Sequence, residues 1–253
     1  PSDLRADGNW TIQADQVVGG DFYLYSGSMD LNGFNISVGG SHIQTGGEVY
    51  CRTGNYNISG STTISGSGYF HVEGGQVSVG GSFTTSDTSL VDMRDSTGTL
   101  DIEGSCTIGG RSAYNYYGNN TYYLTAGTIY VGGDFIQLGT GQNYTNDWSD
   151  PNNKHSFMTS GTLTVVLDGT SGQTVSFESP SGSYFYGLTI NNTSSDNVTF
   201  ATVAQVFGDL NYVDGNLVGS DKLDVGGSAK LVGNWPSDLR ADGNWTIQAD
   251  QVV

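Results

Sequence analysis

The sequence predicts an all-β fold, a parallel β-solenoid with about 20 residues in each coil and two loop insertions. A glycine followed by a small or polar residue and a strand-like segment returns at near-constant spacing, at Gly20, Gly40, Gly60, Gly81 and Gly104. Between these glycines, apolar residues alternate with Asn, Ser, Asp, His and Tyr, which places each set on one face of a strand. Because one coil cannot bury its apolar face alone, coils of near-constant length favour a stacked solenoid over a sandwich of hairpins.

Each coil is expected to contain three short strands, with glycine supplying the backbone conformations that sharp corners need. The intervals from Gly104 to Gly133 and from Gly133 to Gly208 are longer, and we expect them to be coils that carry insertions. The side chains expected in the core, stacked in columns, are Phe22, Leu24, Met29, Leu31, Ile36, Val38, Val49, Ile58, Ile64, Phe70, Val72, Val77, Val79, Phe83, Leu100, Ile102, Val131 and Phe135.

Two stretches interrupt the predicted coils. They are residues 111–124, in the coil that opens at Gly104, and residues 139–155, in the following coil. Tyrosine combines an apolar ring with a hydroxyl group, which suits protein interfaces and stacking on sugars. The candidate lateral-contact or ligand surface therefore consists of Tyr114, Tyr116, Tyr117, Tyr122, Tyr123, Tyr144 and Trp148. The alternative is that these rings pack back on the coil as a satellite cluster.

The stretch from Pro1 to Val18 is repeated letter for letter from Pro236 to Val253. We interpret residues 1–235 as one complete solenoid unit of about ten coils, and residues 236–253 as the start of the next identical unit. An engineered duplication, or one repeat of a fibre with a margin, is the alternative. The candidate inter-repeat junction comprises Trp235, Pro236, Trp245 and Trp10, and Trp10 and Trp245 are expected at equivalent inward positions.

The charge, the apolar runs and the cysteines limit the classes of function that the chain could have. A net charge of −17, from 25 acidic and 8 basic residues, argues against nucleic-acid binding, because phosphate contacts need clustered Lys and Arg. The sequence shows neither a signal peptide nor an apolar run of membrane-spanning length. Cys51 and Cys106 lie three coils apart, beyond disulfide reach, so both are expected to be free and buried.

No constellation for catalysis or metal binding is evident. The three histidines, His42, His71 and His155, have no obvious partner spacing, and Asp92 and Asp95 are interpreted as exposed turn acids. Asp-rich turns match no calcium-loop spacing and are expected to cap turns. We therefore expect no catalytic residue, no metal ion and no cofactor. Sequons that could carry glycans are found at Asn35, Asn57, Asn119, Asn143, Asn191 and Asn197.

The blocks VGGDF, VGGSF and VGGSA, together with GQTVSF, GLTINN and VFGDLNYVDGNL, resemble repeats of right-handed parallel β-helices. The family is that of large secreted bacterial and archaeal surface fibres and filamentous adhesin-like proteins. The resemblance covers most of residues 19–232 and implies an elongated rod outside the cell or on its surface.

The expected function is that of a structural repeat unit in an extracellular fibre. Identical repeats would stack head to tail, and the rods would associate laterally. An adhesin rod that presents its aromatic loops to glycans or proteins is the alternative. A polysaccharide-acting enzyme is a third candidate, but the Asn-Thr-Asp, paired-aspartate, Gly-His-Gly and Arg-x-Lys signatures that such β-helix enzymes carry are missing from this sequence.

Overall fold

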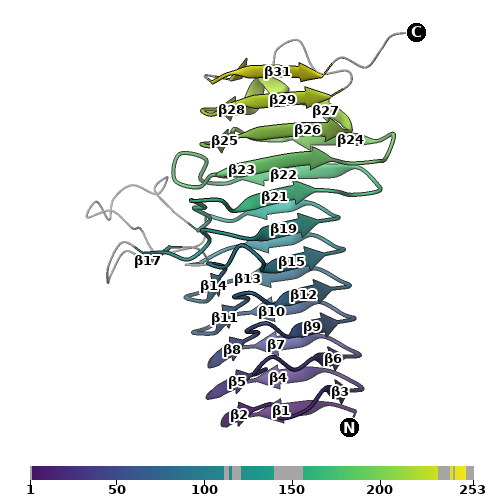
Figure 1. The fold of residues 1–253 in the computed structure, drawn as a ribbon, viewed down its shortest axis with the longest axis vertical. Coiled ribbons are helices and arrows are strands. Elements are labelled where there is room, and N and C mark those ends of the chain that lie inside the picture. The colour runs from purple at the N-terminus through teal and green to yellow at the C-terminus, as the bar shows by residue number, and fades with distance from the viewer. Residues whose placement is uncertain are drawn as a thin grey trace.

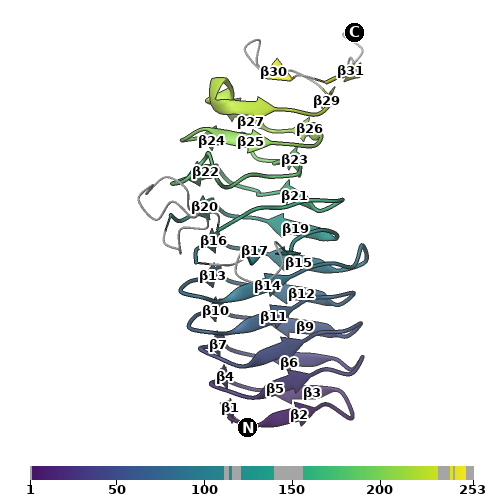
Figure 2. The ribbon, with the colours of Figure 1, turned by 90° about the vertical axis from the view of Figure 1, so that its left-hand side faces the viewer.

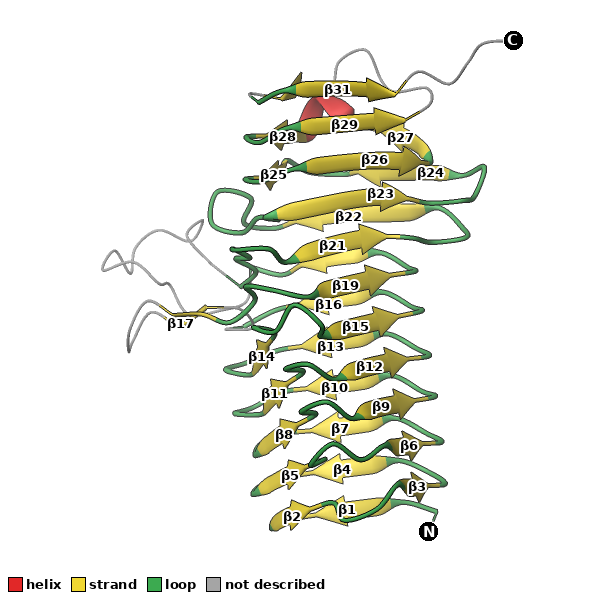
Figure 3. Ribbon diagram, viewed as in Figure 1, coloured by secondary structure: helices red, strands yellow, loops and turns green. Residues whose placement is uncertain are grey.

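The chain winds around one axis in about ten turns of about 21 residues and forms a rod (Figure 1). The computed structural model describes residues 2–110, 114–115, 121–139, 156–232, 240–241 and 243–248. Each turn contributes one segment to each of three parallel walls, which the two perpendicular views show as stacked strands (Figures 2 and 3). The predicted all-β solenoid is confirmed.

Strands one turn apart pair in parallel. The first wall comprises β1 (Leu4–Ala6), β4 (Phe22–Leu24), β7 (His42–Gln44), β10 (Thr62–Ile64), β13 (Phe83–Thr85), β16 (Cys106–Ile108), β20 (Phe135–Gln137), β22 (Gln173–Phe177), β24 (Asn197–Phe200) and β27 (Asn216–Val218). The third wall comprises β3 (Gln16–Val18), β6 (Ile36–Val38), β9 (Asn55–Ile58), β12 (Gln76–Val79), β15 (Thr99–Ile102), β19 (Thr128–Val131), β21 (Thr164–Leu167), β23 (Gly187–Asn191), β26 (Leu210–Asp214), β29 (Ala229–Val232) and β31 (Trp245–Gln248).

The second wall is less regular. It comprises β2 (Asn9–Thr11), β5 (Ser28–Asp30), β8 (Glu48–Tyr50), β11 (Tyr69–His71), β14 (Leu90–Asp92), β25 (Ala204–Val206), β28 (Leu223–Val225) and β30 (Arg240–Ala241). Isolated bridges through Leu124, Thr159, Tyr184 and Phe185 continue it between β14 and β25. Outside the walls, β17 (Tyr114–Asn115) and β18 (Thr121–Tyr122) pair antiparallel, and a 3-10 turn, η1, spans Ser220–Lys222. The described residues contain no α-helix.

Inward side chains fill the space between the walls, and every residue predicted for the core is buried. Strict parallel register explains this burial, because it places each inward side chain directly over the one in the previous turn. One such column on the third wall consists of Val38, Ile58, Val79, Ile102 and Val131. An apolar column of this kind is the expected result of a two-residue alternation repeated once per turn.

The glycine-polar motif forms a hydrogen-bonded ladder at the corner before the first wall. The residue after each glycine accepts a hydrogen bond from the backbone N–H one turn later. The ladder runs from Asp21 to Ser41 (2.7 Å), Ser61 (3.2 Å), Ser82 (3.1 Å) and Ser105 (3.2 Å). The glycine itself is needed because the corner of the preceding turn lies directly against it.

Replacement of Gly104 by alanine is expected to destabilise the rod by about 1–3 kcal/mol, the range typical of overpacking. A methyl group there would lie 2.7 Å from the carbonyl oxygen of Gly81. Gly8 is the matched control, because it occupies the same motif in the first turn, where the nearest atom to a methyl group is 3.8 Å away. Chemical denaturation of both variants tests this, and equal losses would contradict it.

The marker glycines do not all open the same wall, which corrects the expected coil assignment. Gly20 to Gly133 precede strands of the first wall, whereas Gly208 precedes β26 of the third wall and Gly8 precedes β2 of the second. The interval from Gly133 to Gly208 is therefore not a single coil with an insertion, since it contains strands from β20 to β25. The same glycine-polar motif is used at all three corners, so the spacing of the motif alone does not identify the wall that follows it.

The two cysteines are free and buried, as predicted. Cys106 begins β16 of the first wall, three strands beyond β7, and Cys51 directly follows β8 in the same turn as β7. Burial raises the pKa of both thiols, that of Cys106 to about 12, so thiolate chemistry is suppressed in the folded protein.

Candidate functional site

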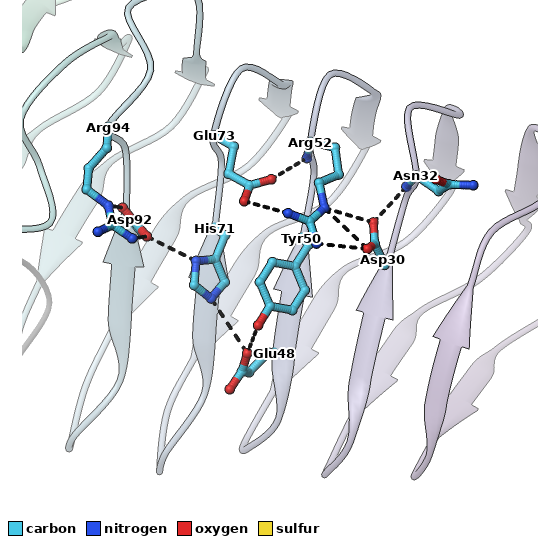
Figure 4. A network of polar contacts seen from close by, with 9 residues as sticks. All are labelled: Asp30, Asn32, Glu48, Tyr50, Arg52, His71, Glu73, Asp92 and Arg94. Carbon is cyan, nitrogen blue, oxygen red and sulfur yellow. Dashed lines mark hydrogen bonds and ion pairs between the residues drawn. The ribbon is translucent and has the colours of Figure 1, made fainter.

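The outward face of the second wall carries a network of charged and aromatic side chains across four successive turns (Figure 4). Parallel register stacks the last residues of four strands, namely Asp30 of β5, Tyr50 of β8, His71 of β11 and Asp92 of β14. Hydrogen-bonded partners on neighbouring turns of this network lie 21 or 22 positions apart in sequence, the length of one turn.

His71 lies at the centre of the network. Its ring stacks on Tyr50 (centroids 4.3 Å apart, 10° between planes) and on Tyr69 (4.0 Å, 28°). Its Nδ1 is 3.0 Å from Oδ2 of Asp92, and its Nε2 is 3.8 Å from Oε2 of Glu48. The Tyr50 hydroxyl donates to that same Glu48 oxygen. Two aromatic faces and the Asp92 carboxylate therefore fix the imidazole, which is 7% exposed, while its Nε2 has no hydrogen-bond partner among the described residues.

Asp92 is almost fully buried and is shared between His71 and Arg94. The Arg94 guanidinium donates from Nε to Oδ1 at 2.6 Å and also to Oδ2. Burial alone would raise the pKa of this carboxyl group, but the hydrogen bonds from His71 and Arg94 outweigh burial and hold the pKa below its usual 3.8. The interpretation of Asp92 as an exposed turn acid was wrong, whereas Asp95 is exposed as expected.

Arg52 links the next part of the network. It forms ion pairs with Asp30 and Glu73, each at 3.0 Å, and its guanidinium lies 4.6 Å from the Tyr50 ring centroid. The hydrogen bond from Arg52 lowers the pKa of Asp30. Arg52 and Glu73 both adopt left-handed backbone conformations (φ 58° and 51°), as does Asn32 (φ 52°) one turn earlier. Non-glycine residues rarely adopt this conformation, which costs about 1 kcal/mol.

A groove of about 430 Å³ lies beside this network. It is lined by Arg52, Thr53, Glu73, Gly74, Asp92, Arg94 and Asp95. Both guanidinium groups already engage carboxylates of the protein, whereas the exposed Asp95 carboxylate accepts hydrogen bonds from Thr97. Chemically, the arrangement can cross-link turns and offer hydrogen bonds to a polar ligand.

Replacement of Asp92 by alanine is expected to lower the free energy of unfolding by about 3 kcal/mol, because it leaves the buried imidazole and Arg94 without their shared partner. Because the pKa of Asp92 is lowered, its contribution is complete above pH 3.8 and is lost as the pH falls through the folded-state value. Asp95→Ala is the control on the same groove and should cost clearly less. Urea unfolding at pH 7 measures both, and equal effects would show that the buried network adds nothing.

The predicted aromatic surface is only partly described. Tyr116, Tyr117, Tyr144, Trp148 and most of both predicted insertions lie outside the described residues. Tyr114 belongs to β17, and Tyr122 is half-buried at the end of β18. Tyr123, by contrast, is 9% exposed and packs edge-on against Tyr69, with Arg94 over its ring. For Tyr123 this agrees with the alternative that the ring packs back on the coil. Leu124 belongs to the core rather than to an insertion.

Both predicted insertions begin and end on neighbouring turns. The first follows β16 and the second follows β20, and these strands pair directly. The chain returns to the second wall at Leu124 and at Thr159, which bridge to each other. The two insertions therefore leave the rod and rejoin it at neighbouring turns.

The sequons differ in accessibility. Asn57 and Asn197 are exposed, Asn35 and Asn191 are half-buried, and Asn119 and Asn143 lie outside the described residues. The Asn35 carboxamide lies between turns, since it donates to Asp15 (3.2 Å) and accepts from the N–H of Asn55 (3.0 Å). Asn57 and Asn197 are thus the more accessible acceptors, and glycan attachment itself stays a prediction.

The duplicated tryptophans do not occupy equivalent positions, contrary to expectation. Trp10 lies on the second wall in the buried column of Met29, but is 38% exposed because it belongs to the first turn. Trp245 lies on the third wall and pairs with Ala229. Trp235 and Pro236 lie outside the described residues.

Over the described part of the chain, no helix has the length and apolarity needed to cross a bilayer. The same residues contain no group of three or more His, Cys, Asp or Glu side chains arranged to hold a metal ion. Comparison with models of protein families, with curated proteins and with solved structures finds no match.

Proposed function

We propose that this chain is a repeat unit of a tandem array that forms an extracellular fibre, and that its role is structural. The observation that carries the proposal is the second copy of the duplicated stretch, which continues the stack as β30 and β31 on β28 and β29. The second copy thus forms the next turn of the same rod, as the start of a following unit would. The resemblance of its glycine blocks to secreted surface fibres, and its acidic surface, support a location outside the cell.

A physical reason for a following unit lies at the two ends of the rod. The outer edges of the first and last turns present unpaired backbone N–H and C=O groups, which pair readily with other strands. Solenoids commonly protect such edges with a capping element. No α-helix covers either edge within the described residues, and the 3-10 turn at Ser220–Lys222 lies before β28. A following unit would satisfy these groups without any dedicated cap.

Imaging of the native material tests this proposal. About ten turns at ~4.8 Å each predict filaments with an axial repeat of ~50 Å per unit. On a denaturing gel, the native chain should migrate as a polymer of many units rather than as a chain of 253 residues. Short monomeric particles from native material, with no chain longer than one unit, would overturn the proposal.

A second function, presentation of ligand-binding loops, is favoured by the neighbouring departure points of the two insertions. It is also favoured by Arg94, which lines the groove and contacts the ring of Tyr123 in the first predicted insertion. Glycan-array binding by the full chain would support it. Loss of that binding after replacement of residues 112–121 by a short glycine-serine linker, with unchanged thermal stability, would assign it to the first insertion. Binding that survives this replacement would leave the groove or the second insertion as the contact.

A further inference from the structure

The two copies of the duplicated stretch are placed on different walls of the rod. In the first copy, Leu4–Ala6 form β1 of the first wall and Asn9–Thr11 form β2 of the second. In the second copy, Arg240–Ala241 form β30 of the second wall and Trp245–Gln248 form β31 of the third (Figure 2). The same residues are therefore advanced by one wall after ten turns.

The corner chemistry permits this shift. In the first copy, Gly8 and Asn9 enter the second wall, where Ser28 donates to the Gly8 carbonyl oxygen (3.1 Å) and to the Asn9 side chain (3.2 Å). In the second copy, Gly243 enters the third wall and donates to the Gly227 carbonyl oxygen (2.9 Å). Both corners stack glycine on glycine with a polar residue next to it, so each accepts the Gly-Asn dipeptide.

The backbone register on the new walls is regular. On the second wall, residues 240 and 241 pair with Asp224 and Val225. On the third wall, residues 245–248 pair in order with residues 229–232. The shifted copy thus continues both walls in parallel.

We propose that successive units of the array dock end to end with a rotation of one third of a turn, in addition to the twist of the rod. This rests on the proposed function, with a second copy of this chain as the partner. The unit then spans ten turns and one wall, so its second-wall network faces a new direction in each successive unit. Apart from the twist of the rod, three such rotations complete one full turn over three units, or ~150 Å along the axis. Lateral contacts are therefore distributed around the fibre rather than along one side.

Disulfide trapping in the 253-residue chain tests this docking. In the shifted arrangement, the pairs D224C/R240C and K230C/T246C lie directly opposite each other on neighbouring strands. If the second copy kept the walls of the first, residue 240 would lie on β27 and residue 246 on β28, so V218C/R240C and D224C/T246C would form instead. The native cysteines are buried and should not compete.

We expect the two shifted pairs to oxidise at least about ten-fold faster than the two unshifted pairs, because a disulfide requires Cα atoms within about 7 Å. Faster closure of the unshifted pairs would overturn the proposal. Equal rates for all four pairs would show that the last turn has no fixed wall and would overturn it as well.

The experiments distinguish a failure of the fibre proposal from a failure of the proposed rotation between units. Native filaments together with unshifted disulfides would leave the fibre in place and remove the rotation. Shifted disulfides without native filaments would remove the fibre and leave the docking geometry of the second copy. In filaments, helical reconstruction should give a rise of ~50 Å per unit and, after the twist of the rod is subtracted, a rotation of one third of a turn per unit.

Discussion

Replacement of Val79 by aspartate is expected to cost about 4 kcal/mol or more of folding free energy. Val79 is fully buried on β12, and its column places it between Ile58 and Ile102 of the adjacent turns. A carboxylate there would lose its hydration without gaining a partner, and an uncompensated buried charge typically costs about 3–5 kcal/mol. The hydrophobic transfer energy of the valine is lost in addition.

The matched control is Asn57→Asp. Asn57 lies on the neighbouring strand β9 but faces outward, with Ser37 and Ser78 as its uncharged neighbours in register. An exposed substitution of this kind usually changes stability by less than about 0.5 kcal/mol. Both variants introduce one negative charge on the same wall, so the difference between them isolates burial from net charge.

Urea unfolding and hydrogen exchange together measure the effect. Because repeat proteins can unfold in parts, loss of amide protection in β9, β12 and β15 of the Val79→Asp variant is the more specific readout. Protection equal to that of Asn57→Asp would mean that position 79 is not part of a closed interior and would contradict the solenoid core.

The core could be predicted because its signal is local. Val77 and Val79, or Leu100 and Ile102, lie two positions apart, and this spacing alone decides which side chains share a face. The glycine spacing then supplies the length of a turn. No knowledge of the register was needed, because any in-register stack buries the same residues.

The second-wall network was missed because its signal is not local. His71 and Asp92 are 21 positions apart, and Asp30 and Arg52 are 22 apart, so neither pair matches a short motif. The length of a turn was already visible in the sequence. A search for complementary side chains at that separation would have paired both of them and would have removed Asp92 from the exposed acids.

The wall occupied by each strand could not be predicted. The Gly-Asn dipeptide before Trp10 and before Trp245 is identical, yet one enters the second wall and the other the third. All three corners use the same glycine-polar motif. The wall that a copy of the motif enters is therefore set by the number of residues in the preceding turns. The turns that contain the two insertions make that length irregular, and the equivalence of the tryptophans was inferred wrongly for this reason.

Lowering the pH from 6.5 is expected to destabilise the rod through His42. This side chain is fully buried in the first wall, and neither of its ring nitrogens has a hydrogen-bond partner among the described residues. The rings of Phe22, Tyr56 and Phe70 surround it at centroid distances of 5.2, 5.4 and 5.7 Å. An imidazolium in these surroundings would be a charge without a counter-ion or a hydration shell.

Burial lowers the pKa of His42 from 6.5 to about 3. Between these two values the unfolded chain binds a proton that the native protein does not, so stability increases with pH across this window. The stability that His42 provides is complete above pH 6.5 and decreases by roughly 1.4 kcal/mol for each pH unit below it, until the folded-state pKa is reached. The lowered pKa values of Asp30 and Asp92 act in a different window, below 3.8.

Urea unfolding between pH 4 and pH 7 compares three proteins. In His42→Leu, the slope of the free energy of unfolding against pH should decrease by the equivalent of about one bound proton. At pH 7 the free energy of unfolding should be at least that of the original chain, because an unpaired buried polar group is removed. Thr62→Val is the control, since Thr62 lies opposite His42 on the next turn and also has a buried polar atom without a partner. That variant should shift stability equally at every pH and keep the original slope. An unchanged slope in His42→Leu would show that His42 is protonated in the folded protein, and that the core around it is open to water.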